Sequence, residues 1–149
     1  MFEQLRNVLR QQRRQATPSI GEQQRLAAAV LLLEVARADY EHQPAEVEAL
    51  RSGLAREFAV PQAELDALLG EAAQRAQQSV SLFEFVQALN RTMSTEGKRG
   101  LLNLLWTVAH ADGRIDPHEE HLLRRIADLL HLSHTDFISG KLKKGSDPF

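Results

Sequence analysis

Acidic side chains surround one predicted helix junction of the chain in a pattern that could bind a cation. The segment Ala111-Asp112-Gly113-Arg114-Ile115-Asp116-Pro117-His118-Glu119-Glu120 carries the carboxylates of Asp112, Asp116 and Glu119 close together in the sequence. Oxygen donors of this kind favour hard divalent cations such as Ca²⁺ and Mg²⁺, whereas Zn²⁺ is usually held by nitrogen and sulfur. The spacing therefore predicts a candidate divalent-cation site.

The same residues have a structural interpretation, which stays open. Asp116 can cap the helix that follows, and Glu119 at its third position completes a capping box. Asp112 is explained less well, because an acid in the last turn of a helix faces the negative end of the helix dipole. Arg114 or Arg124 could compensate its charge, and so could a bound cation.

A partial copy of this segment lies earlier in the chain. Ten of the 21 positions from 31 to 51 are identical to their counterparts from 104 to 124, and with one position deleted the alignment continues beyond them. The pairs that could do chemistry are Asp39 with Asp112, Pro44 with Pro117, and Glu46 with Glu119. Amphipathic helices explain shared leucines but not this set, so we expect a helix–loop–helix unit used twice. Asp39 and Glu46 then form a second, weaker candidate cation site.

The elements that must position these residues are predicted to be helices. Apolar residues recur at spacings of three and four, and no alternating β-branched run predicts a strand. We expect an all-α fold, a compact bundle of about seven to eight helices built from two pseudo-symmetric helix–loop–helix repeats. Capping residues and prolines place the helices at about 1–14, 19–38, 44–58, 61–78, 81–93, 94–111, from Asp116 through Leu130, and from Ser133. Ser81 with Glu84 is expected to cap the fifth of these.

The composition predicts one domain with basic ends. The 149 residues are 43% hydrophobic and 26% charged, which is typical of a single compact domain. Residues 1–15 carry a net charge of +3 and residues 141–149 of +2, whereas residues 16–140 carry −7. An acidic body argues against nucleic acid as a partner. We divide the chain into a basic amphipathic helix at 1–17, a helical domain at 20–142 and a frayed basic tail at 143–149.

The predicted N-terminal helix has three candidate binding surfaces. Phe2, Leu5 and Leu9 form one apolar stripe beside four arginines. Such a helix can lie on an anionic membrane, in the groove of a partner, or on its own bundle.

Several kinds of chemistry are not supported by the sequence. The absence of cysteine excludes disulfides, thiolate metal sites and a cysteine nucleophile. Nucleophile-elbow, phosphate-loop and dinucleotide fingerprints do not occur, so we expect no enzyme activity and no organic cofactor. The longest apolar run, Leu26 to Leu33, is far shorter than the roughly 20 residues that span a bilayer, and the early arginines do not fit a secretory signal. We expect a cytoplasmic protein.

The acidic segment and the helix before it resemble a known family. Leu105-Trp106-x-Val108-Ala109-x-Ala111-Asp112-Gly113, followed by Asp116-Pro117-x-Glu119-Glu120, is similar to the tellurite-resistance TerB-like domain. The first copy matches the same motif more weakly, through Glu34-Val35-Ala36-x-Ala38-Asp39 with Pro44 and Glu46. It has Tyr40 and Gln43 where the second copy has Gly113 and Asp116. The resemblance covers about residues 20–142.

The resemblance implies a non-enzymatic, all-helical domain that chelates a metal ion. The residues carried over are Asp112, Asp116 and Glu119, then Asp39 and Glu46. It also implies a role in bacterial responses to tellurite and metal stress, with a protein partner among membrane-associated stress-response components. A purely structural interaction scaffold, or a co-chaperone-associated module without a metal site, is the alternative, and homo-oligomerisation stays open.

Overall fold

The computed structural model describes residues 19–37, 44–111, 113 and 115–145, and within that part of the chain it is all-α. The helices are α2 (Ile20–Arg37), α3 (Pro44–Glu57), α4 (Gln62–Gln78), α5 (Phe83–Thr92), α6 (Thr95–Ala109), α7 (Pro117–Leu129) and α8 (His134–Gly145). The predicted fold class is therefore confirmed. The helix expected at residues 1–17 lies outside the described residues. Helix α8 continues to Gly145, past residue 142 where we ended the helical domain.

Serine side chains cap three of the helices as predicted. The Ser19 hydroxyl accepts a hydrogen bond from the backbone N–H of Glu22 at 3.1 Å, and the Ser94 hydroxyl accepts one from Gly97 at 3.1 Å. At α8 the cap is reciprocal. The N–H of Asp136 donates to the Ser133 hydroxyl at 3.0 Å, and the N–H of Ser133 donates to the Asp136 carboxylate at 3.3 Å. Each cap satisfies backbone donors that the first helical turn leaves free.

The predicted cap of α5 is wrong. The N-cap residue is Leu82, whose side chain makes no cap hydrogen bond, and the Ser81 hydroxyl accepts from the N–H of Phe83 instead. The Glu84 carboxylate accepts a hydrogen bond from the hydroxyl of Ser79. Glu84 is thus turned back toward the end of α4, because the link between the two helices is short enough to bring Ser79 within reach.

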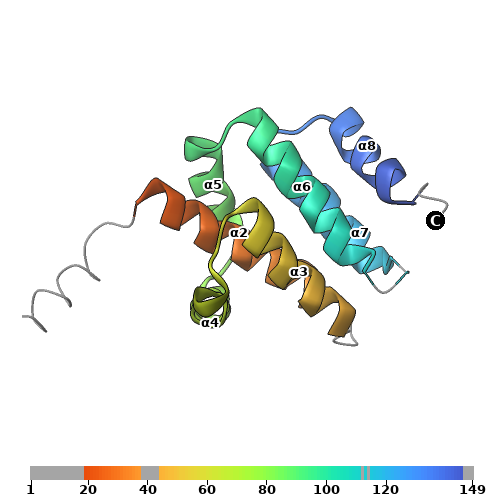
Figure 1. Ribbon diagram of the computed structural model, residues 1–149. Coiled ribbons are helices and arrows are strands. Elements are labelled where there is room, and N and C mark those ends of the chain that lie inside the picture. Colours follow the sequence, from red (N-terminus) through yellow and green to blue (C-terminus); the bar gives the residue numbers. More distant parts are fainter. Residues whose placement is uncertain (1–18, 38–43, 112, 114, 146–149) are drawn as a thin grey trace, which may run out of the picture.

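Helices α2 and α6 form the centre of the bundle (Figure 1). They contact each other, and between them they contact every other helix that the structure describes. The continuous run from Ala27 to Leu32 is at most 2% exposed, as is most of α6 from Leu101 to Ala109. A helix that is apolar on all sides is buried on all sides, which explains why α2 has no solvated face over this run.

The second helix of each sequence copy begins at the matching proline. Pro44 begins α3, and its counterpart Pro117 begins α7. The two non-glycine residues with positive φ in the described chain are Ala59 at 53° and His131 at 61°. The alignment pairs these two positions after its deletion, and each joins the second helix of a copy to the third. Superposition of the two units stays a prediction.

Helices α3 and α6 approach closely at Gly53. A Cβ atom built on Gly53 would lie 2.2 Å from Cδ1 of Leu104, a residue that is 2% exposed in the core. Gly53 therefore has a packing role, whereas Gly70 in the middle of α4 has nothing within 4 Å of the same position.

We predict opposite effects on stability for alanine at these two glycines. Gly53→Ala should lower the free energy of unfolding by about 1–3 kcal/mol, because the methyl group overpacks the core. Gly70→Ala should raise it by about 0.5–1 kcal/mol, because alanine restricts the unfolded chain and favours helix. Urea denaturation followed by circular dichroism measures both. Equal shifts in one direction would contradict the close approach of α3 and α6.

The Asp136 cap predicts a pH dependence. Burial raises the pKa of Asp136, but hydrogen bonds from the backbone and hydroxyl of Ser133, together with the Arg99 guanidinium at 2.9 Å, outweigh burial and hold the pKa below its ordinary 3.8. A lowered folded-state pKa stabilises the fold above the ordinary value, and the contribution disappears as pH falls through the lowered pKa. Asp136→Asn should therefore destabilise the protein at pH 7 and lose that effect as the pH falls below 3.8. The exposed Asp128→Asn is the control, and parallel stability curves for the two variants would contradict the assignment.

Candidate functional site

Two glutamates in the first turns of α3 and α7 are fully buried. Glu46 in α3 and Glu119 in α7 are each 0% exposed, and they are the buried charged side chains of the described residues. Each lies in the first turn of its helix, shortly after the proline that begins it. Burying a carboxylate costs several kcal/mol unless hydrogen bonds or a positive charge compensate it. The positive end of the helix dipole supplies part of that compensation at both sites.

Sequence reasoning identified both glutamates as candidates but not their burial. A glutamate in the first turn of a helix is usually exposed, and for Glu119 capping gave a sufficient explanation. The repeat could have revealed this burial. In both copies the shared glutamate lies four residues before a shared leucine, Leu50 or Leu123, and therefore on the same side of the helix. Both of those leucines are 0% exposed.

The starts of α3 and α7 lie toward the same end of the bundle. Figure 1 shows them at the lower right, together with the ends of α2 and α6. The two glutamates thus lie at one end of the molecule. The segments that carry Asp39 and Asp112 follow α2 and α6 in the sequence, but both aspartates lie outside the described residues.

Asp116 acts as the predicted N-cap of α7. Its Oδ1 atom accepts a hydrogen bond from the backbone N–H of His118 at 2.7 Å, and Pro117 occupies the first helical position. The capping interpretation of Asp116 is confirmed. Within the described residues, which include three of the five candidate ligands, no group of three histidine or acidic side chains is placed to hold a metal ion. The candidate set as a whole therefore stays a prediction.

One arginine considered as a partner of Asp112 is used for helix packing. The guanidinium of Arg124 lies 4.9 Å from the ring centroid of Phe137 in α8. Its counterpart in the first copy, Arg51, forms an ion pair with Asp66 of α4 at 2.7 Å. In each copy this arginine ties the second helix to the third. Arg114, the other arginine considered, is outside the described residues.

Trp106 lies against the end of α6 that leads to the acidic segment. It is 0% exposed, and its ring lies 5.7 Å from that of His110 and 5.0 Å from that of Phe137. His110 is the C-cap residue of α6. The indole is therefore a built-in fluorescent probe of the junction between α6 and α8, next to the start of the acidic segment.

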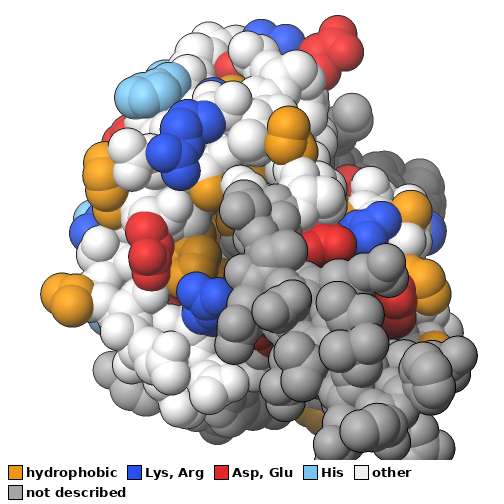
Figure 2. Space-filling view, turned by 90° about the vertical axis from the view of Figure 1, so that its left-hand side faces the viewer, with side chains coloured by type: hydrophobic (Ala, Val, Ile, Leu, Met, Phe, Trp, Pro, Cys, Tyr) orange, Lys and Arg blue, Asp and Glu red, His pale blue; other side chains and the backbone are white. Residues whose placement is uncertain are grey.

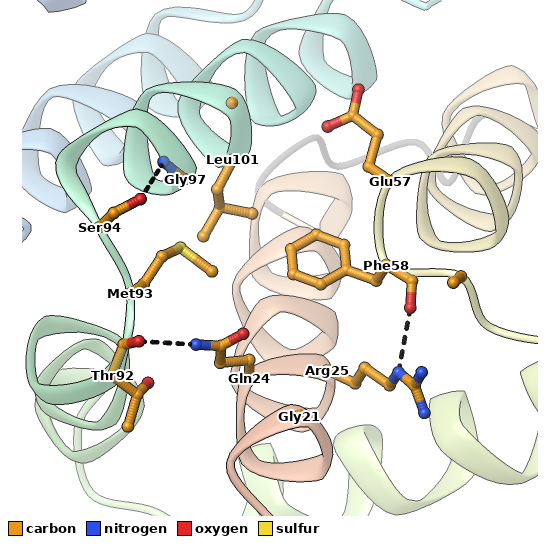
Figure 3. Close-up of a pocket in the computed structure, with 12 residues that line it drawn as sticks. Gly21, Gln24, Arg25, Glu57, Phe58, Thr92, Met93, Ser94, Gly97 and Leu101 are labelled. Carbon is orange, nitrogen blue, oxygen red and sulfur yellow. Dashed lines mark hydrogen bonds between the residues drawn. The ribbon is translucent and has the colours of Figure 1, made fainter.

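A cavity of about 690 Å³ lies at the opposite ends of α2 and α6, where both helices begin. Figure 3 shows Phe58, Met93 and Leu101 around it. Gln24 donates from Nε2 to the carbonyl of Thr92 at 2.9 Å, and Arg25 donates from Nε to the carbonyl of Phe58 at 3.0 Å. None of the candidate cation ligands lines this cavity, so it is separate from the acidic site.

The surface is mixed in character. On the face in Figure 2, the hydrophobic side chains in view are scattered among charged and polar ones. Val80 and Phe83, at the link between α4 and α5, are exposed apolar residues. No helix in the described ranges is long and apolar enough to cross a membrane.

Together the fold and the site define an all-α bundle with an acid buried at the start of two helices, α3 and α7. The family described as tellurite resistance protein TerB matches residues 25–142, which is most of the chain. The chain belongs to this family, as its sequence resemblance predicted. No curated protein and no solved structure is significantly similar to it.

We predict that the cap at Asp116 stabilises α7 without any metal. Asp116→Ala should lower the free energy of unfolding by about 1 kcal/mol in buffer containing a chelator, because the N–H of His118 loses its acceptor. Asp116→Asn keeps an acceptor at the N-cap and should cost less. Denaturation midpoints of the unmodified protein and the two variants measure the loss of stability. An unchanged midpoint for the alanine variant would show that the cap does not stabilise α7.

Proposed function

We propose that this TerB-family domain is a non-enzymatic module that binds a divalent cation and a protein partner during the response to tellurite or metal stress. Membership of the family associates the domain with tellurite resistance. Cation binding, the partner and a cytoplasmic location go beyond that membership and are part of the proposal.

The burial of Glu46 and Glu119 carries the cation proposal. Both side chains are withdrawn completely from water at the end of the bundle where α2 and α6 end. Packing alone would favour an apolar residue at such a position, because replacing buried charges with apolar side chains is often neutral or stabilising. A carboxylate kept in this environment fits a role that needs its charge.

The donor chemistry fits a hard ion. Asp112, Asp116 and Glu119 offer carboxylate oxygens only, and Asp39 with Glu46 offer the same in the first copy. Oxygen donors favour Ca²⁺ or Mg²⁺ over Zn²⁺. About three protein oxygens fall short of the 6 to 8 that Ca²⁺ takes, so water completes the shell and the affinity is expected in the micromolar to millimolar range.

A purely structural scaffold is the second candidate, and the cap at Asp116 favours it. The Oδ1 atom of Asp116 is already engaged by the N–H of His118. Glu46 and Glu119 both lie where a helix dipole stabilises an anion. In that case the acids hold the helices together and a protein partner is the only ligand.

Calorimetry with variants distinguishes the two candidates. The full chain is titrated with Ca²⁺, Mg²⁺, Mn²⁺ and Zn²⁺, and Trp106 emission is followed in parallel. We expect saturable heat below about 5 mM for at least one hard ion. Glu119→Gln should weaken the fitted affinity at least tenfold, because a neutral amide replaces a charged ligand with nearly the same shape.

The matched control is Glu48→Gln, at an exposed glutamate of α3 close to Glu46 in the sequence. It removes the same charge from the protein and should leave the affinity unchanged. Equal weakening by both variants indicates a diffuse electrostatic effect and contradicts a site at Glu119. No saturable heat with any ion overturns the cation proposal and leaves the scaffold.

A further inference from the structure

A groove between α2 and α4 lies beside the start of the described fold. It has a volume of about 390 Å³, and its apolar lining is formed by Leu26, Val60, Ala67 and Leu68. Leu26 and Leu68 are half-buried, and Ala67 is exposed. The groove therefore offers apolar surface between two packed helices.

Acidic side chains predominate on the sides of this groove. Glu22 of α2 and Glu64 and Glu71 of α4 line it, and all three are exposed. Arg25 and Arg75 also line it, so acidic side chains exceed basic ones by three to two. The groove thus suits a ligand that is apolar on one side and basic on the other.

The N-terminal segment of the same chain has this character. The spacing of Phe2, Leu5 and Leu9 predicts one apolar face, and residues 1–15 carry a net charge of +3 from four arginines and one glutamate. The chain leads from this segment directly into Ser19, and Glu22 and Gln23 of the groove follow at the start of α2. The point of attachment is therefore already beside the groove.

We propose that residues 1–17 dock as an amphipathic helix in the groove between α2 and α4 of their own chain. A helix of about 14 residues is roughly 21 Å long, and α4, with 17 residues, is about 25 Å long, so the lengths match. The Thr17-Pro18 step can reverse the direction of the chain, because the residue before a proline is disfavoured in helix.

The apolar stripe supplies most of the affinity, and the arginines set the orientation. An exposed ion pair contributes too little to hold the segment alone. Burial of Phe2, Leu5 and Leu9 contributes more for each residue. Because the segment is tethered by a short connection, its effective concentration at the groove is in the millimolar range, so a weak contact is sufficient.

The cavity at the starts of α2 and α6 is a poorer fit for this segment. Its charged lining residues, Glu57 and Arg25, cancel each other, whereas the groove has three acidic and two basic lining residues. Four arginines of the segment would find less compensation there than beside Glu22, Glu64 and Glu71.

Spin-label distances in the full chain test the proposal. The chain has no cysteine, so Gln4→Cys with Gln74→Cys gives one label on the segment and one on the exposed side of α4. We expect a narrow distance distribution in the doubly labelled protein diluted with unlabelled chain. Ala67→Lys places a positive charge in the groove at an exposed position and should abolish the narrow component. Val80→Lys, at a fully exposed residue outside the groove, should preserve it.

Three results would overturn docking in cis. A broad distribution in the unmodified sequence means that the segment does not dock. A narrow distance between two singly labelled chains after mixing assigns the segment to a second copy. A distribution that is broad in solution and narrows with vesicles containing anionic lipid assigns it to a membrane surface. Circular dichroism of each variant verifies that the bundle is folded.

Discussion

The packing of α2 against α6 is the constraint on which the rest of this structure depends. Both helices are apolar on nearly every side along their buried stretches, so neither can exist in water without the other helices around it. Small residues make this arrangement compact: Ala27, Ala28 and Ala29 are at most 2% exposed in α2, and Gly53 lets α3 come close to α6. Because α2 and α6 both begin at the cavity end, their other ends lead to the two acidic segments. The position of the candidate site is thus a consequence of how two central helices pack.

Burial is the property of the two glutamates that helix capping alone does not explain. Capping accounts for Asp116, whose carboxylate bonds to the backbone of α7. Capping requires only a side chain near the helix start, whereas Glu46 and Glu119 are withdrawn completely from water. Desolvating a carboxylate is expensive, and an apolar residue would fill the same space at lower cost. A carboxyl group buried at these two positions therefore needs hydrogen-bond donors or a positive charge beside it.

Most of the fold could be predicted from local features of the sequence. The features that depend on contacts between distant helices could not. The caps at Ser19, Ser94 and Ser133 could be recognised because a serine and the N–H that it caps lie within one helical turn and interact without help from other helices. The cap of α5 could not, because Glu84 bonds to Ser79 across a link whose path is set by how α4 and α5 pack. For the same reason the sequence named Arg124 as a partner for an acid, but not the ring of Phe137 that it contacts. The acidic candidates could be identified from their types and spacing, whereas their burial depends on the whole bundle.

A cation bound by these acids would couple binding to folding. Glu46 and Glu119 each lie in the first turn of a helix, α3 or α7, that contacts both α2 and α6. An ion that binds only the folded arrangement stabilises it by RT ln(1 + [L]/Kd), which is about 2.7 kcal/mol at a hundredfold excess over Kd. A domain of this size is typically stable by about 5–15 kcal/mol, so such a gain is a substantial fraction of the total. Even a weak site can therefore shift the balance between the folded domain and its opened states, and that shift can be read at the junction of α6 and α8, where Trp106 is buried against Phe137.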